Sequence, residues 1–149
     1  MFCPPSRPRD TARAMSQENV EIVRRLWSAA ERGDDQAVYA LYDSGIVWTS
    51  HAGSPLGMGG GTTYGHDGVR QFFRDWLESF ELYYAKADEF VEAGDQVVVG
   101  YRVSGRGKAS GMNVEMPRWN VYGIRNGLVA QVEIFDNKPE ALEAAGLSE

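Results

Sequence analysis

The chain has a single cysteine, Cys3, among its 149 residues. It therefore cannot form a disulfide within itself, and its cysteine usage gives no sign of an oxidising compartment. The two histidines, His51 and His66, lie far from Cys3 in the sequence, so no zinc-type cluster is indicated. Residues 1–14 hold three prolines and three arginines without an apolar run, which excludes a signal peptide or membrane span there. We expect residues 1–14 to be a disordered leader and residues 15–149 to form the domain.

Basic residues are also in short supply. The chain has 15 Lys and Arg against 21 Asp and Glu, a net charge of −6. This balance, with no basic stripe, argues against nucleic-acid binding and against association with an anionic membrane. The hydrophobic share of 43% suits one globular domain that buries its own core. A cytoplasmic protein is expected.

Motifs that would hold a nucleotide or activate a nucleophile are missing. Residues 57–62 (GMGGGT) have Thr62 where a dinucleotide-binding motif needs its third glycine. Residues 105–111 miss a phosphate-loop pattern by one position and lie between two expected strands. No G-x-S-x-G segment occurs, so a hydrolase triad is not indicated. The sequence predicts no cofactor and no metal.

Helical periodicity is present mainly in the first half. Ser16 is a suitable N-cap for a helix that Gly33 ends, and Asp34 or Asp35 caps a shorter helix as far as Tyr42. The clearest helix spans residues 69–80, where apolar residues repeat at helical spacing. A short helix is expected over residues 139–145.

Alternating apolar and polar residues predict strands in the second half. The expected strands are residues 46–50, 82–91, 96–106, 112–124 and 129–136, and the fourth is broken or bulged at Pro117. Asn126-Gly127 is a strong hairpin signal. The glycine-rich stretch 51–65 is expected to be irregular, as a lid or pocket rim. We predict an α+β fold, with a curved, antiparallel or mixed sheet covered on one face by three helices from the N-terminal half.

Asp136 is the first catalytic candidate. It shares a face with Val132 and Ile134, so the alternation carries its carboxylate toward the apolar side. Apolar neighbours would raise its pKa and suit it to proton transfer near neutral pH. The alternative is that Asp136 or Asn137 only tethers the final helix.

Further candidates flank the glycine-rich stretch or are aromatic. Thr49 and His51 extend the alternation from Val47 and are candidates to face inward, His51 as a proton shuttle. His66 belongs either to a pocket mouth or, preferably, to the start of its helix. Four aromatic side chains are candidates to line a pocket for a flat, mostly apolar ligand, or else to fill the core: Trp27, Tyr64, Tyr101 and Trp119.

Several local strings resemble the SnoaL-like branch of the nuclear transport factor 2-like superfamily. They are residues 19–41 with the central Gly33-Asp34, residues 64–69 (YGHDGV), residues 125–129 (RNGLV) and residues 140–147 (EALEAAGL). The resemblance covers residues 16–147. It implies a cone-shaped α+β barrel with a pocket at its open end, and a homodimer formed through the sheet. Fold alone does not choose an activity.

Two enzymes of this superfamily differ from the chain at their catalytic positions. The groups of ketosteroid isomerase fall at Leu26, Thr49 and Trp119, which cannot perform its proton transfer. Polyketide cyclases and limonene epoxide hydrolase carry an aspartate late in the chain, where Asp136 lies. The hydrolase pattern is incomplete, because Arg102, Arg118, Asn120 and Tyr122 are present without a second inward aspartate.

These observations leave two functions open. The first is a cofactor-free acid/base enzyme on a small apolar molecule, with Asp136 as acid or base, His51 or Tyr101 polarising the substrate, and Trp27, Tyr64 and Trp119 as walls. The second is a ligand-binding or dimerisation module of the same fold without catalysis.

Overall fold

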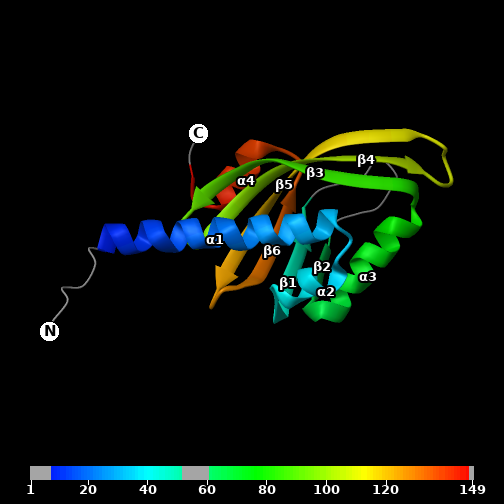
Figure 1. The fold of residues 1–149 in the computed structure, drawn as a ribbon. Helices are drawn as coiled ribbons and strands as arrows, with labels where there is room; N and C mark the ends of the chain where they lie inside the picture. The colour runs from blue at the N-terminus through cyan, green and yellow to red at the C-terminus, as the bar shows by residue number, and fades with distance from the viewer. Residues whose placement is uncertain (1–7, 52–60, 148–149) are drawn as a thin grey trace, which may run out of the picture.

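The computed structural model describes residues 8–51 and 61–147, and their side chains apart from those of residues 8–14 and Leu82. Within these ranges the chain forms one curled six-stranded sheet (Figure 1) with the strand order β2-β1-β6-β5-β4-β3. The β1 and β6 strands pair in parallel, and every other neighbouring pair is antiparallel. The strands are β1 (Tyr42–Ser50), β2 (Gly61–Tyr64), β3 (Phe80–Ala93), β4 (Gln96–Gly107), β5 (Asn113–Arg125) and β6 (Leu128–Phe135).

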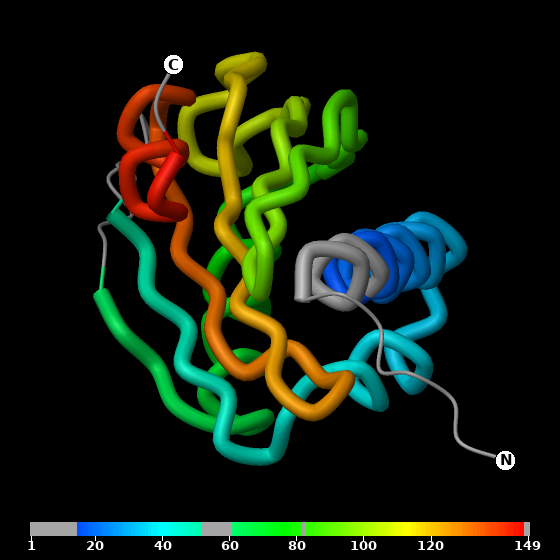
Figure 2. Tube along the Cα trace, turned by 90° about the vertical axis from the view of Figure 1, so that its left-hand side faces the viewer, coloured from blue at the N-terminus to red at the C-terminus, as the bar shows by residue number. Residues whose placement is uncertain are grey.

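Helices cover both faces of the sheet. The concave face is covered by α1 (Pro8–Glu31), α2 (Asp35–Ala40) and α3 (Gly65–Glu78), while α4 (Lys138–Ala144) packs on the convex face. Figure 2 shows α1 in blue and α4 in red on different sides of the curved strands. No helix among the described residues is both long and apolar enough to cross a membrane.

Side-chain alternation separates two cores. On β4, Val97, Val99 and Tyr101 turn to the concave side, and the first two join the main core beneath α1. Val98 turns the other way and packs with Ala141 of α4. Each fully buried valine of this kind stabilises the fold by about 1.5–3 kcal/mol. The period of two therefore lets one sheet carry a helix layer on each face.

The predicted α+β layout and the β-hairpin are confirmed. Asn126 and Gly127 have φ angles of 54° and 77°, the pair of positive values that a two-residue type I′ turn requires. Asp34 caps α2 by accepting a hydrogen bond from the Ala37 amide, as expected.

Expectations about local structure are wrong at Ser16, at residues 61–64 and at Pro117. Ser16 does not cap a helix, because α1 already begins at Pro8, and its hydroxyl instead bonds Glu92 of β3 at 3.5 Å. Residues 8–14 are thus helical, while residues 1–7 of the expected leader lie outside the described residues. In the expected irregular stretch, residues 61–64 form β2 on the edge of the sheet.

Pro117 neither breaks nor bulges β5. It pairs with Arg102 of β4 in a continuous register. The described pairing of β5 with β6 starts only at Trp119, so Pro117 lies where β5 has no recorded neighbour on that side and its missing N–H costs little. The proposed lid over residues 53–61 lies almost entirely outside the described residues.

We expect Gly100→Ala to lower the free energy of unfolding by about 1–3 kcal/mol, because overpacking strains a well-packed contact. A Cβ at Gly100 would lie 2.5 Å from two carbons of the Trp119 ring on the convex face. Chemical denaturation measures the loss. In a Trp119→Leu background the same glycine substitution should cost much less, and an equal cost in both backgrounds would contradict this steric account.

Candidate functional site

A cavity of about 670 Å³ lies between the concave face of the sheet and the helices α1, α2 and α3. Its volume falls within the usual range for small-molecule sites, about 300–1,000 Å³. Its walls are mainly apolar and aromatic, because the inward positions of β1, β4 and α3 carry large rings. The aromatic lining residues are Trp27, Tyr39, Tyr42, Trp48, Phe72, Phe73, Trp76, Tyr83, Tyr84, Tyr101 and Tyr122.

A hydrogen-bonded row of four side chains forms one wall of the cavity. Tyr101 of β4 donates from its hydroxyl to Asn120 Oδ1 of β5 at 2.9 Å. Asn120 Nδ2 donates to the Tyr122 hydroxyl at 3.0 Å, and Trp27 Nε1 of α1 donates to the same hydroxyl at 3.1 Å. Asn120 and Tyr122 alternate onto one face of β5, so the row runs across the sheet and up to the helix. It brings four buried or half-buried polar groups to one place.

Burial raises the pKa values of the cavity phenols, which are protonated at neutral pH even without that shift. It raises the pKa of Tyr122 to about 12. The hydrogen bonds from Asn120 and Trp27 lower that pKa, but by less than burial raises it. It raises the pKa of Tyr83 to about 12 as well, although the nearby Trp76 indole and the Arg118 guanidinium act in the opposite direction. The pKa values of Tyr42 and Tyr101 are raised well above 10 for the same reason. These groups therefore keep a hydrogen that they can donate at neutral pH, and they do not act as bases there.

Arg118 lies at the cavity wall and also contacts groups outside the cavity. It lines the cavity from β5, and its side chain is only 11% exposed. One of its guanidinium nitrogens, Nη1, lies 2.9 Å from the Pro117 carbonyl and 3.3 Å from Asp136 Oδ1. Arg118 thus places a positive charge at the cavity wall and a carboxylate behind it.

Asp136 does not face the apolar interior, and that expectation is wrong. Its side chain is 50% exposed and is not part of the cavity wall. β6 ends at Phe135, and Asn137 then caps α4 by accepting a hydrogen bond from the Glu140 amide at 3.0 Å, so Asp136 lies between the end of the strand and the start of the helix. The tethering alternative therefore applies to Asn137, whereas Asp136 pairs with Arg118.

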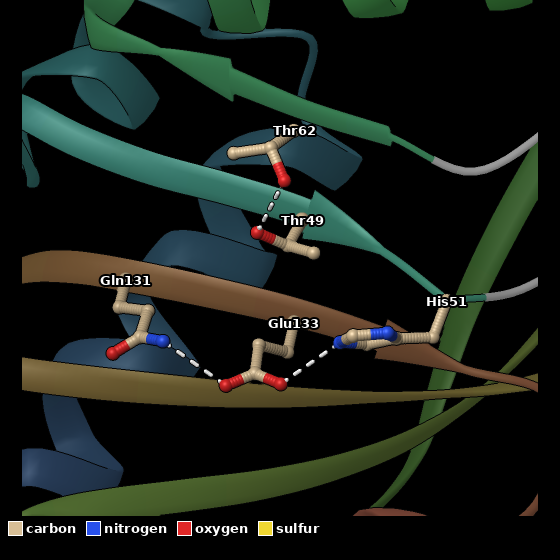
Figure 3. A network of polar contacts seen from close by, with 5 residues as sticks. All are labelled: Thr49, His51, Thr62, Gln131 and Glu133. Carbon is tan, nitrogen blue, oxygen red and sulfur yellow. Dashed lines mark hydrogen bonds and ion pairs between the residues drawn. The ribbon is translucent and has the colours of Figure 1, made fainter.

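Thr49 and His51 do share a face, but it is the convex one. Trp48 and Ser50 are the residues of this part of β1 that line the cavity. The Thr49 and Thr62 hydroxyls are 3.2 Å apart, and His51 Nε2 lies 3.0 Å from Glu133 Oε2. Both contacts are drawn in Figure 3. The His51 ring also stacks on Phe135, with 4.8 Å between centroids. The expectation that they face inward is wrong.

The remaining three candidates also lie away from the cavity. Trp119 covers Gly100 on the convex face, next to the α4 cluster. Tyr64 is 71% exposed at the start of α3. His66 Nε2 donates to the Tyr42 carbonyl at 3.0 Å, which fixes the start of α3, as its preferred structural role implied. Of the eight residues named from the sequence, the cavity contains Trp27 and Tyr101.

The cavity brings together polar side chains that the sequence showed only as part of an incomplete hydrolase pattern, without indicating them as site residues. Asn120 and Tyr122 are buried at 4% and 3% exposure, and Arg118 alternates with them on β5. The available signal was this alternation of Arg118, Asn120 and Tyr122, opposite the apolar Val121. Among the described lining residues the carboxylates are Glu31 and Asp35, both on the exposed rim.

Two further wall residues hold buried polar atoms. Trp48 Nε1 and Trp76 Nε1 have no hydrogen-bond partner among the described residues. An unpaired buried donor costs about 1–3 kcal/mol. No group of three or more His, Cys, Asp or Glu residues in the described part of the chain is placed to hold a metal ion.

The sequence and the fold are similar to those of known proteins. Residues 23–132 match the family model of the SnoaL-like domain. A nuclear transport factor 2-like protein of Burkholderia thailandensis is 29% identical, with 86% of this chain and 96% of that chain covered and a TM-score of 0.71. One of unknown function from Burkholderia pseudomallei is 28% identical, with 85% and 95% covered and a TM-score of 0.70. TerC, crystallised with polyporic acid, is 20% identical, with 87% and 98% covered and a TM-score of 0.69. No curated protein matches the sequence.

We expect stability to fall in alkali as a result of the buried phenols. An unfolded phenol has a pKa of about 10, whereas that of folded Tyr122 is about 12. The raised pKa leaves its contribution intact below about pH 10, and the contribution is lost as the pH rises toward 12, by roughly 2–3 kcal/mol per phenol. Chemical denaturation at several pH values measures this. Tyr122→Phe should lose less stability than the wild type over that interval, and parallel curves would rule the explanation out.

Proposed function

The chain belongs to the SnoaL-like domain family, and from that premise we propose that it binds a small, flat, largely apolar molecule in the cavity. The observation that carries the proposal is an aromatic-walled cavity of about 670 Å³ with a row of polar groups along one wall. Aromatic walls supply contact area to a flat ligand, and a few fixed polar groups orient it. The protein's function then depends on which molecule fits the aromatic walls and also pairs with the polar groups.

The electrostatics of the cavity support a neutral or electron-rich ligand. Its buried polar groups include phenols, an amide, the indole N–H groups of Trp48 and Trp76, and the Arg118 guanidinium. Such groups present N–H and O–H donors. A cationic ligand would find no buried carboxylate among the described lining residues, because Glu31 and Asp35 are exposed.

We expect naphthalene-sized aromatic compounds to raise the melting temperature of the wild type, because a ligand that binds only the folded state stabilises it. Ala85→Trp should abolish the shift, since Ala85 lines the cavity and the indole would occupy it. The matched control is Ala109→Trp, at an exposed position outside the cavity wall. Differential scanning fluorimetry gives the readout. A shift that persists undiminished in Ala85→Trp would mean that the compounds bind elsewhere.

A second candidate function is cofactor-free acid/base catalysis on the same ligand. The Arg118–Asp136 pair favours it, because Arg118 reaches the cavity wall and its partner carboxylate lies 3.3 Å from Nη1. Asp136 would accept or donate the proton, and the donors of Tyr101 and Tyr122 would polarise the substrate. The reaction classes that fit are isomerisation, aldol-type cyclisation, dehydration and epoxide hydrolysis.

Asp136→Asn tests the catalytic proposal on a panel of substrates from these four classes. For a substrate that the wild type converts, we expect kcat to fall by about 100-fold, the usual contribution of a positioned acid or base. Asp88→Asn, an exposed substitution on β3, serves as the matched control. Steady-state kinetics measure the effect. Equal rates for wild type and Asp136→Asn would remove Asp136 from the mechanism.

A further inference from the structure

The row of polar groups in the cavity holds one hydroxyl hydrogen that it does not use. The Tyr122 oxygen accepts from Asn120 Nδ2 at 3.0 Å and from Trp27 Nε1 at 3.1 Å. Both contacts use hydrogens of the neighbours, because an indole N–H can only donate. The Tyr122 hydrogen therefore remains, and it has no acceptor among the described residues.

Reversing the Asn120 amide does not remove this surplus. With Oδ1 and Nδ2 exchanged, Tyr122 would donate to the amide oxygen and the amide nitrogen would donate to Tyr101. The Tyr101 hydroxyl hydrogen would then be the one without an acceptor. In both orientations the row of Trp27, Tyr122, Asn120 and Tyr101 keeps one phenol hydrogen to give away.

The unused hydrogen lies where a ligand can take it. Tyr101, Asn120 and Tyr122 all line the cavity, and their surroundings are apolar. Water in such a site is held poorly without several polar partners, whereas a ligand oxygen with an aromatic body would bring its own packing. An unsatisfied buried donor favours a molecule that pairs it over one that does not.

We infer that the ligand carries an acceptor oxygen of the carbonyl class, conjugated to a flat apolar ring system, and that this oxygen accepts the spare phenol hydrogen of the Tyr101–Asn120–Tyr122 row. This inference rests on the proposed function and narrows it to a chemical class. It also gives the row a role beyond structure, because a donor held by a buried amide is oriented before the ligand arrives. The raised pKa of both phenols ensures that the hydrogen is present at neutral pH.

A matched pair of probes tests the inference. The ketone 2-acetylnaphthalene and the alkene 2-isopropenylnaphthalene have nearly the same shape, but only the ketone has an acceptor oxygen. Isothermal titration calorimetry should show that the wild type binds the ketone about tenfold more tightly, the effect of one well-placed hydrogen bond. Tyr122→Phe should bring the two affinities together by weakening the ketone alone. Tyr64→Phe, which removes an exposed phenol outside the cavity, should keep the preference.

The double variant Tyr101→Phe/Tyr122→Phe removes the spare hydrogen in both amide orientations. If Tyr122→Phe alone keeps the preference for the ketone and the double variant loses it, the inference is also supported. A preference that survives in the double variant overturns it. Equal binding of both probes to the wild type overturns it too, while leaving the proposed function intact. Failure of both probes to bind would instead overturn the proposed function.

An infrared measurement on the wild type covers the case in which the variants do not fold. The C=O stretch of the bound ketone should lie at lower frequency than in an alkane solvent, because a donated hydrogen bond weakens the carbonyl bond. An alkane-like frequency in the complex would overturn the inference.

Discussion

The cavity depends on one buried amide. Asn120 is 4% exposed in the middle of β5, where an unpaired amide would be costly. It is paired by the hydroxyls of Tyr101 and Tyr122, and Tyr122 is paired in turn by the Trp27 indole of α1. The polar row thus ties two strands to the helix that covers them. The same contacts keep these rings at the wall of the cavity, so the polar and aromatic parts of the site are positioned together.

The sequence was sufficient to predict the helices and the sheet, but not which face of the sheet each set of alternating side chains occupies. Alternation in β1 shows that Val47, Thr49 and His51 lie together, yet it cannot say which side of the sheet they occupy. The structure assigns Trp48 and Ser50 to the cavity, and it leaves His51 outside against Phe135 and Glu133. The deciding information is tertiary: α1 and α3 cover one face, and α4 covers the other. The same ambiguity placed Trp119 at the site in place of Asn120, its neighbour on the opposite face.

Asp136 shows a second limit of pattern reasoning. Alternation with Val132 and Ile134 does not show how deeply Asp136 lies, because β6 ends one residue earlier and the side chain is half exposed beside Arg118. Asn137 then competes for the backbone by capping α4, which turns the chain away from the sheet. An arginine two strand positions before Asn120 could have been predicted to seek a carboxylate. That its partner would be Asp136 depends on how β5 and β6 are aligned, which the sequence does not reveal.

The groups assembled around the cavity differ in their chemical roles. Its interior offers phenols whose pKa values burial raises above 10, and these can donate but not abstract a proton near neutral pH. A carboxylate that could act as a base lies outside, paired with Arg118. An interior of fixed donors stabilises negative charge on an oxygen, either resting charge or charge that develops during a reaction. Recognition of an oxygen acceptor therefore needs only the interior, whereas proton transfer would also require the substrate to extend as far as the Arg118 edge.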